Sequence, residues 1–163
     1  MDTKAFRGAL GRFPTGVCLI TVDDPQSGPL ALTANSFASV SLDPALVLWS
    51  VQNDSEHFRE YTACENFGVS VLGADQMDLS NYYATKHQHS IIADQFEFDA
   101  FGVPLLRDAQ ATFSCRIDAL HPGGDHHIIV GEVIDFSARE GAPLVFFGGA
   151  YDGLQSQGEG GSR

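Results

Sequence analysis

Apolar residues occur along the chain in short runs separated by Gly, Pro and Asp. Runs rich in β-branched and aromatic residues predict strands over residues 17–22, 30–41, 46–51, 67–72, 111–120, 127–136 and 143–147. Apolar residues at helical spacing predict short helices over residues 3–12, 55–65 and 75–86, with Thr3 and Ser55 as the residues that cap the first two. Residues 88–99 fit neither pattern and are expected to form an ordered loop.

The order of these elements indicates the fold class. Strands follow one another in runs and do not alternate regularly with helices, which favours a β-barrel with appended helices over a doubly wound parallel sheet. The 163 residues suit one domain. We place it at residues 1–152, because residues 153–163 are rich in Gly, Ser and Gln and predict a flexible tail.

Charge and composition exclude several classes of partner. The formal net charge is −12, and Lys4 and Lys86 are the only lysines. Nucleic acids and anionic membranes attract clustered cations, so neither is an expected partner. Any phosphate-bearing ligand would have to be held by backbone N–H groups, hydroxyls or helix N-termini. Three widely spaced cysteines without a CxxC pair, and no secretory signal, predict reduced thiols in the cytoplasm.

Small polar residues interrupt the predicted strand at residues 30–41. Thr33, Asn35, Ser36 and Ser39 leave room for a flat ligand to reach the backbone and offer groups that hydrogen-bond it. A barrel strand with one polar face explains the same residues, and composition alone favours that explanation. The helix predicted to start at Ser55 offers a second candidate, a phosphate site at its N-terminus, although most such helix starts bind nothing.

A third candidate is the turn before the predicted strand 127–136. Two glycines present Asp125 and His126, and the carboxylate can orient the imidazole toward a cleft. Exposed histidines on an ordinary turn are the alternative. No metal site is predicted, since the histidines match neither HExxH nor a zinc-ligand spacing. The chain also lacks the GxGxxG, GxxxxGK[ST] and GxSxG motifs, which argues against a Rossmann site, a P-loop and a nucleophile elbow.

Taken together in order, several short motifs identify a family. They are Phe6-Arg7, Phe13-Pro14-Thr15-Gly16-Val17, Leu32-Thr33-Ala34-Asn35-Ser36-Phe37, Ser39-Val40-Ser41-Leu42-Asp43-Pro44, Phe67-Gly68-Val69-Ser70-Val71-Leu72, Gly124-Asp125-His126 and Gly131-Glu132-Val133. Over residues 3–154 the chain resembles the flavin reductase-like family, the small reductase components of two-component flavin monooxygenases. The resemblance implies a six- to seven-stranded split barrel with Greek-key connections, paired as a homodimer.

The resemblance also implies an activity and a set of site residues. The expected enzyme passes hydride from NADH or NADPH to FMN or FAD and supplies the reduced flavin to a partner oxygenase. His126 is the expected contact to the nicotinamide and the single candidate for a catalytic role. The expected flavin-binding and cleft-lining residues are Pro14, Thr15, Thr33, Ala34, Asn35, Ser36, Ser39, Ser50, Ser55 and Phe96.

One position departs from the family pattern. Members often carry Asp-Lys-Phe where this chain has Asp94-Gln95-Phe96, so a positive charge is missing and the preference for FMN or FAD can differ. Two other functions stay open from the residues alone. One is a split barrel that binds flavin or haem without turnover, and the other is a metal-dependent barrel enzyme that uses the histidines.

Overall fold

The computed structural model describes residues 1–154 and is built mainly from antiparallel strands, as the sequence predicts. In chain order the elements are α1 (Thr3–Leu10), β1 (Thr15–Gly16), β2 (Cys18–Asp24), β3 (Gly28–Ala34), β4 (Ala38–Leu42), β5 (Ala45–Gln52), α2 (Phe58–Ala63), β6 (Asn66–Val71), α3 (Met77–Ala84), the 3₁₀ turn η1 (Ala93–Gln95), β7 (Phe96–Phe98), β8 (Pro104–Leu106), β9 (Ala111–Gly123), β10 (His126–Ala138), β11 (Leu144–Phe147) and β12 (Ala150–Gly153).

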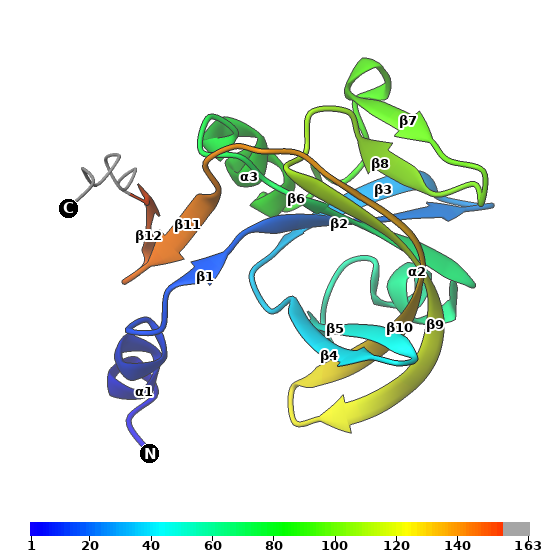
Figure 1. The fold of residues 1–163 in the computed structure, drawn as a ribbon. Coiled ribbons are helices and arrows are strands. Elements are labelled where there is room, and N and C mark those ends of the chain that lie inside the picture. The colour runs from blue at the N-terminus through cyan, green and yellow to red at the C-terminus, as the bar shows by residue number, and fades with distance from the viewer. Residues whose placement is uncertain (155–163) are drawn as a thin grey trace.

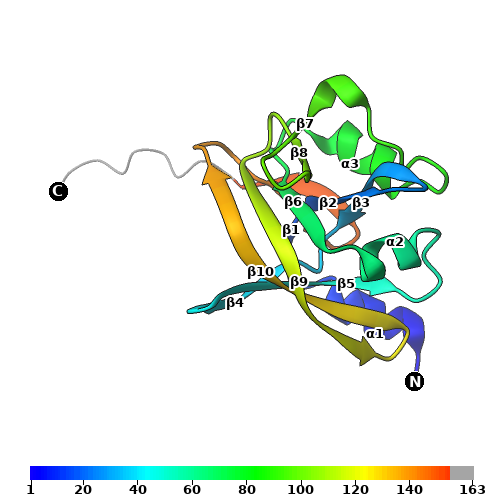
Figure 2. The same cartoon turned by 90° about the vertical axis from the view of Figure 1, so that its right-hand side faces the viewer.

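Seven strands form the main sheet in the order β3-β2-β6-β9-β10-β5-β4. The two edge strands, β3 and β4, are neighbours in the sequence, because only residues 35–37 separate them. Three extended residues span about 10 Å, so the edges must come close and the sheet must curl into an incomplete barrel (Figures 1 and 2). The split between these edges lies at Asn35, inside the segment of small polar residues.

Two hydrophobic clusters lie on opposite sides of this sheet. One fills the curl and includes Trp49, Tyr61 and Phe67, with α2 contributing the tyrosine. The other includes Tyr83 of α3 and Phe96 of β7, whose rings meet edge to face at 6.0 Å. Burying a side chain of this size contributes about 1.5–3 kcal/mol to the free energy of folding. Both clusters therefore hold α2, α3 and the β7–β8 hairpin against the sheet.

The N-terminal helix and a small second sheet stand to one side of the barrel. This sheet has the order β1-β11-β12, and α1 lies below it in Figure 1. No residue of α1 is buried. The helix is held at its end, where the Gly148 N–H donates to the Gly11 carbonyl at 2.9 Å.

The structure corrects three predictions of local structure. The expected strand 30–41 is two strands, since the chain leaves the sheet at residues 35–37. Asp2, not Thr3, caps α1, and its Oδ1 accepts from the N–H groups of Lys4 and Ala5. The second helix begins at Phe58 without a side-chain cap, so Ser55 lies in the turn before it.

The remaining differences concern the least regular sequence. Within the expected loop, residues 93–98 form η1 and β7, and residues 104–106 pair with them as β8. The strand β12 was not predicted, and Gly153 ends it, although we expected the tail to start there. The rest of that predicted tail, from residue 155, lies outside the described residues. Among residues 1–154, no helix combines the length and the apolar character needed to cross a bilayer.

Candidate functional site

The split in the barrel opens into two connected cavities, which we call the groove. The larger, about 350 Å³, is lined by Leu32, Thr33, Ala34, Asn35, Ser36, Ser50, Val51, Gln52, Ser55, Ala84 and His126. The smaller, about 190 Å³, shares Thr33, Ala34, Asn35 and Ala84 with it and adds Val17, Phe146 and Tyr151. Segments far apart in the sequence, including β3, β5, α3, β10 and the β11–β12 hairpin, therefore build one site.

Small side chains leave the backbone of this groove accessible. Ala34, Ser36, Ser50 and Ala84 present at most a methyl or hydroxymethyl group. No lysine or arginine lines either cavity among the described residues. The groove thus suits a flat ring that meets backbone and small polar groups, and it offers no cation for a phosphate.

The hydroxyls of the groove are partly occupied by the protein itself. Ser36 Oγ accepts from the Ser50 N–H at 3.0 Å and donates to the Ser50 carbonyl at 3.3 Å, which fastens the segment between β3 and β4 to β5. Thr33 Oγ1 donates to the Ser80 carbonyl at 2.7 Å. The amide of Asn35 makes no hydrogen bond within residues 1–154, so its donor and acceptor are free for a ligand.

His126 enters the groove from the tight turn between β9 and β10. Gly124 has φ of +72°, a conformation that favours glycine, and this turn places Asp125 beside the imidazole. His126 Nδ1 lies 2.7 Å from Asp125 Oδ1 and donates to it, which leaves Nε2 as the free nitrogen of the ring. This hydrogen bond is the main cause of the lowered pKa of Asp125.

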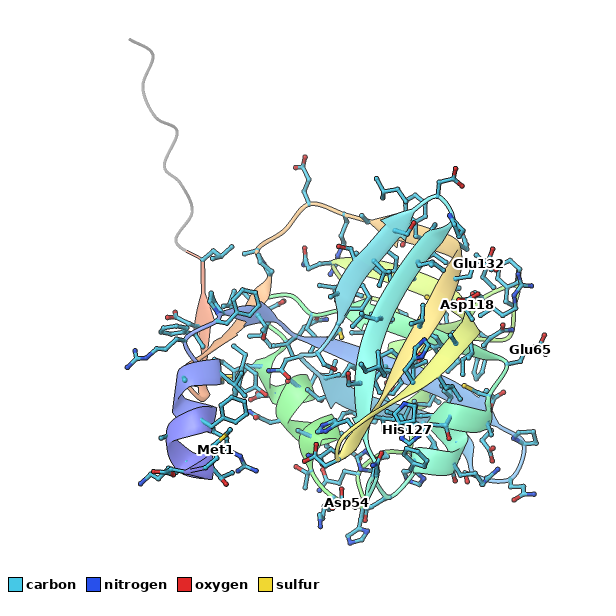
Figure 3. All side chains as sticks on the ribbon, turned by 90° about the horizontal axis from the view of Figure 1, so that it is seen from below. Met1, Asp54, Glu65, Asp118, His127 and Glu132 are labelled. Carbon is cyan, nitrogen blue, oxygen red and sulfur yellow. The ribbon has the colours of Figure 1, made fainter. Side chains whose placement is uncertain are left out.

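The neighbouring histidine serves another part of the molecule. His127 Nδ1 lies 2.7 Å from Asn53 Oδ1, and its ring meets Phe58 edge to face at 5.1 Å. Successive side chains of a strand point to opposite faces, so His126 lines the groove whereas His127 packs against α2. The label in Figure 3 places His127 beside that helix. Among residues 1–154, no group of three or more His, Cys, Asp or Glu is placed to hold a metal ion.

Most of the residues predicted from the sequence meet in this groove. They are Thr33, Ala34, Asn35, Ser36, Ser50, Ser55 and His126. Thr15 lines an adjoining cavity of about 330 Å³, which also touches Asn35. The structure does not bring Pro14, Ser39 or Phe96 into the groove: Pro14 and Ser39 are exposed, and Phe96 is 3% exposed in the core.

Sequence reasoning missed the wall formed by Ala84, Phe146 and Tyr151. The two aromatic rings lie 5.5 Å apart at 64°. The hydroxyl of Tyr151 shares a 2.7 Å hydrogen bond with Ser80 Oγ, which ties β12 to α3. The signal for this wall was the two glycines between the strand ending at Phe147 and Tyr151, which predict a turn and a second strand.

A curled antiparallel sheet whose split edge opens on a groove of small residues defines a split-barrel protein. A family model described as "Flavin reductase like domain" matches residues 10–155, and the chain belongs to this family. At 43% identity over 156 residues, it is similar to the FMN reductase (NADH) SmoA of Agrobacterium fabrum, with 96% of this chain and 88% of that protein covered.

Solved structures agree with this assignment. The NADH:FAD oxidoreductase SgcE6 of Streptomyces globisporus, solved with NAD and FAD fragments, superimposes with a TM-score of 0.89 at 37% identity, covering 97% of this chain and 96% of that one. BorF, the reductase component of a bacterial two-component tryptophan halogenase, superimposes with a TM-score of 0.88 at 35% identity. The match covers 96% of this chain and 100% of BorF. Some relatives are longer: the chain spans 48% of the reductase component of a trigonelline monooxygenase from Acinetobacter baylyi, at 34% identity over 148 residues.

Proposed function

We propose that the protein is an NAD(P)H:flavin oxidoreductase that passes hydride from NADH or NADPH to FMN or FAD and hands reduced flavin to a partner oxygenase. The observation that carries the proposal is the groove, where small residues and a free Asn35 amide lie within one cavity with His126. The names of relatives support it, since SmoA and SgcE6 are NADH-dependent flavin reductases and BorF serves a halogenase.

The residues of the groove fit a flavin and a nicotinamide. The flavin, when bound, supplies the ring that accepts hydride. The protein's contribution is position and polarity: small side chains from Thr33 to Ser36 let the ring approach the backbone, and the Asn35 amide hydrogen-bonds its polar edge. His126 orients the nicotinamide carboxamide through Nε2, because Asp125 holds Nδ1.

Two further parts of the proposal concern assembly and location. Phe6, Leu10 and Phe13 are 49%, 58% and 75% exposed on or beside α1. Such a row of exposed apolar side chains supports a homodimer. All three cysteines are free thiols, which supports the reducing cytoplasm.

Anaerobic spectroscopy of the purified protein tests the activity. We expect NADH or NADPH to bleach the visible absorbance of added FMN or FAD at a rate proportional to enzyme concentration. A bound flavin that neither nucleotide reduces would contradict a reductase and indicate a non-catalytic binding module. Absence of any flavin binding would remove both functions.

A further inference from the structure

The nucleotides of the proposed reaction carry phosphates, yet the groove contains no lysine or arginine among the described residues. From the sequence, the candidate phosphate site is the N-terminus of a helix predicted to start at Ser55. The structure weakens that candidate, because α2 begins only at Phe58 and is six residues long. A phosphate at this site therefore needs another partner.

Among residues 1–154, the unpaired cations concentrate near the N-terminus. Ion pairs occupy Arg59, Arg107, Arg116 and Arg139. The cations of residues 1–154 that form no ion pair or side-chain hydrogen bond are Lys4, Arg7, Arg12 and Lys86. Three of these lie on α1 or directly after it, whereas the acidic residues Glu65, Asp118 and Glu132 lie across the barrel from α1 (Figure 3). In a chain of net charge −12, residues 1–12 therefore carry three unpaired cations and a single acidic residue, Asp2.

Arg7 is the cation of this group that borders the site. It lines the 330 Å³ cavity that also touches Thr15, Asn35 and Phe146. Asn35 and Phe146 belong to the groove as well, so the two spaces adjoin. Arg7 also makes the smallest of several contributions to the lowered pKa of Asp125, whose main cause is the hydrogen bond from His126.

We infer that Arg7 binds a phosphate of the nucleotide whose ring occupies the groove. A guanidinium that forms no ion pair or side-chain hydrogen bond with the described residues offers the paired N–H donors that match phosphate oxygens. The residue would hold the phosphate end at the mouth of the site while the ring lies among the small residues. This inference rests on the proposed function, and the phosphate can belong to the nicotinamide nucleotide or to the flavin nucleotide.

Calorimetric titration of the Arg7→Gln variant tests the inference without turnover. The probes are NAD⁺, FMN and riboflavin, which has the flavin ring but no phosphate. We expect Arg7→Gln to weaken binding of at least one phosphate-bearing probe about tenfold, the usual loss for one charged hydrogen bond, and to leave riboflavin unchanged. Arg7→Lys should keep part of the affinity. The matched control is Arg12→Gln, which removes an exposed, unpaired cation close to Arg7 in the sequence and should change nothing.

The pattern of losses identifies the source of the phosphate. A loss confined to NAD⁺ assigns Arg7 to the nicotinamide nucleotide, and a loss confined to FMN assigns it to the flavin. Unchanged binding of both, or equal losses in Arg7→Gln and Arg12→Gln, would overturn the inference. A wild-type protein that binds these probes but oxidises no NADH or NADPH would refute the proposed function and leave the Arg7 result standing.

Discussion

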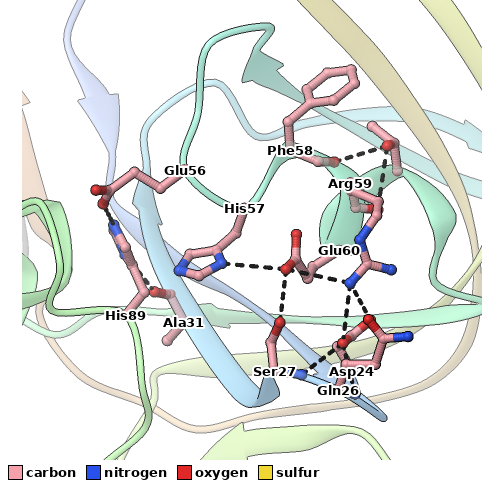
Figure 4. A network of polar contacts seen from close by, with 11 residues as sticks. Asp24, Gln26, Ser27, Ala31, Glu56, His57, Phe58, Arg59, Glu60 and His89 are labelled. Atoms are coloured by element: carbon pink, nitrogen blue, oxygen red, sulfur yellow. Dashed lines mark hydrogen bonds and ion pairs between the residues drawn. The ribbon is translucent and has the colours of Figure 1, made fainter.

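The groove and a second polar cluster lie next to each other in the sequence but differ in how their polar groups are used, and Figure 4 shows all members of the cluster except His87. We call the second region the histidine–carboxylate cluster, and its members are Asp24, Ser27, Glu56, His57, Arg59, Glu60, His87 and His89. In the groove, Asn35 and one nitrogen of His126 remain free. In the cluster, carboxylates meet the hydroxyl, imidazole and guanidinium groups of their neighbours.

The contacts of Glu56 and Glu60 show how the carboxylates of the cluster are paired. Glu60 Oε1 accepts from Ser27 Oγ at 2.8 Å and lies 3.4 Å from Arg59 Nη2. Glu56 lies 2.7 Å from His87 Nδ1 and 3.2 Å from His89 Nε2. The other nitrogen of the buried His89 donates to the Ala31 carbonyl at 3.2 Å.

This difference indicates that the groove binds ligands whereas the histidine–carboxylate cluster stabilises the fold. A polar group that is already paired gains little from a ligand, whereas an unpaired group at a cavity wall gains a full contact. The cluster joins the β2–β3 turn, the start of α2 and the segment after α3, so it fixes the frame around the groove. Substitutions in the groove should therefore change binding and leave stability unchanged, and substitutions in the cluster should do the reverse.

The largest effect is expected from filling the groove. Ala84 is exposed and lines both of its cavities. Ala84→Trp should occupy the space of the ring and weaken flavin binding about 100-fold, since steric overlap costs about 3 kcal/mol. Titration of flavin fluorescence measures the loss. Asn81→Trp, on the same helix but outside these cavities, is the control, and tight flavin binding by Ala84→Trp would place the flavin elsewhere.

A smaller and more selective effect is expected at the histidine turn. His126→Ala removes the Nε2 contact and should lower kcat/KM for NADH about tenfold, which corresponds to about 1.4 kcal/mol. Flavin affinity should stay within about twofold of the wild type. His121→Ala, an exposed histidine of β9, is the matched control. Lost flavin binding with unchanged NADH kinetics would show that His126 serves the flavin instead.

The cluster is tested by a change in stability. Glu60 is 9% exposed, and Glu60→Ala removes the acceptor of Ser27 and one of the two carboxylate partners of Arg59. We expect the free energy of unfolding to fall by about 1 kcal/mol, measured by urea denaturation, with the affinity for flavin unchanged. The control is Glu65→Ala, which removes an exposed carboxylate. An unaltered urea midpoint combined with weaker flavin binding would reverse the roles of the two regions.

The fold could be predicted from two kinds of sequence feature: local residue patterns and the order of short motifs along the chain. Runs of β-branched residues and turn glycines located most strands, and the small residues from Thr33 to Ser36 marked the groove. The wall at Phe146 and Tyr151 was missed, because its position depends on a hairpin that pairs with β1 at the other end of the chain. Phe96 was assigned to the cofactor because its neighbours suggested a family motif, but packing against Tyr83 buries it.

The start of the second helix was also predicted wrongly, because contacts between distant segments act on the residues that follow Ser55. A serine before an acidic, apolar-spaced segment predicts a capped helix, yet residues 55–57 form a turn in which the Ser55 carbonyl accepts from the Phe58 N–H at 3.1 Å. His57 Nδ1 lies 3.6 Å from Glu60 Oε1, three residues later, and Glu56 pairs with His87 and His89 from the segment after α3. Long-range pairing of these side chains outweighs the local preference for an earlier helix start.

The smallest effect is the dependence of stability on pH, and it belongs to the cluster. Hydrogen bonds from the backbone N–H groups of Ser27 and His87 are the main causes of the lowered pKa of Asp24 and Glu56. Burial raises the pKa of Glu60, but contacts including the Ser27 hydroxyl outweigh it, so this pKa is also lowered.

A carboxylate whose pKa is lower in the folded state stabilises the protein fully above its unfolded value, which is about 4. This contribution disappears as the pH falls through the lower, folded value. Urea midpoints should therefore be steady from about pH 7 to 5 and decrease below about pH 4. Glu56→Gln should flatten this decrease, because its side chain no longer titrates, whereas Asp118→Asn, an exposed residue of β9, should not. A pH profile unchanged by Glu56→Gln would mean that the acid sensitivity does not arise at Glu56, and Asp24, whose pKa is also lowered, would be the next carboxylate of the cluster to replace.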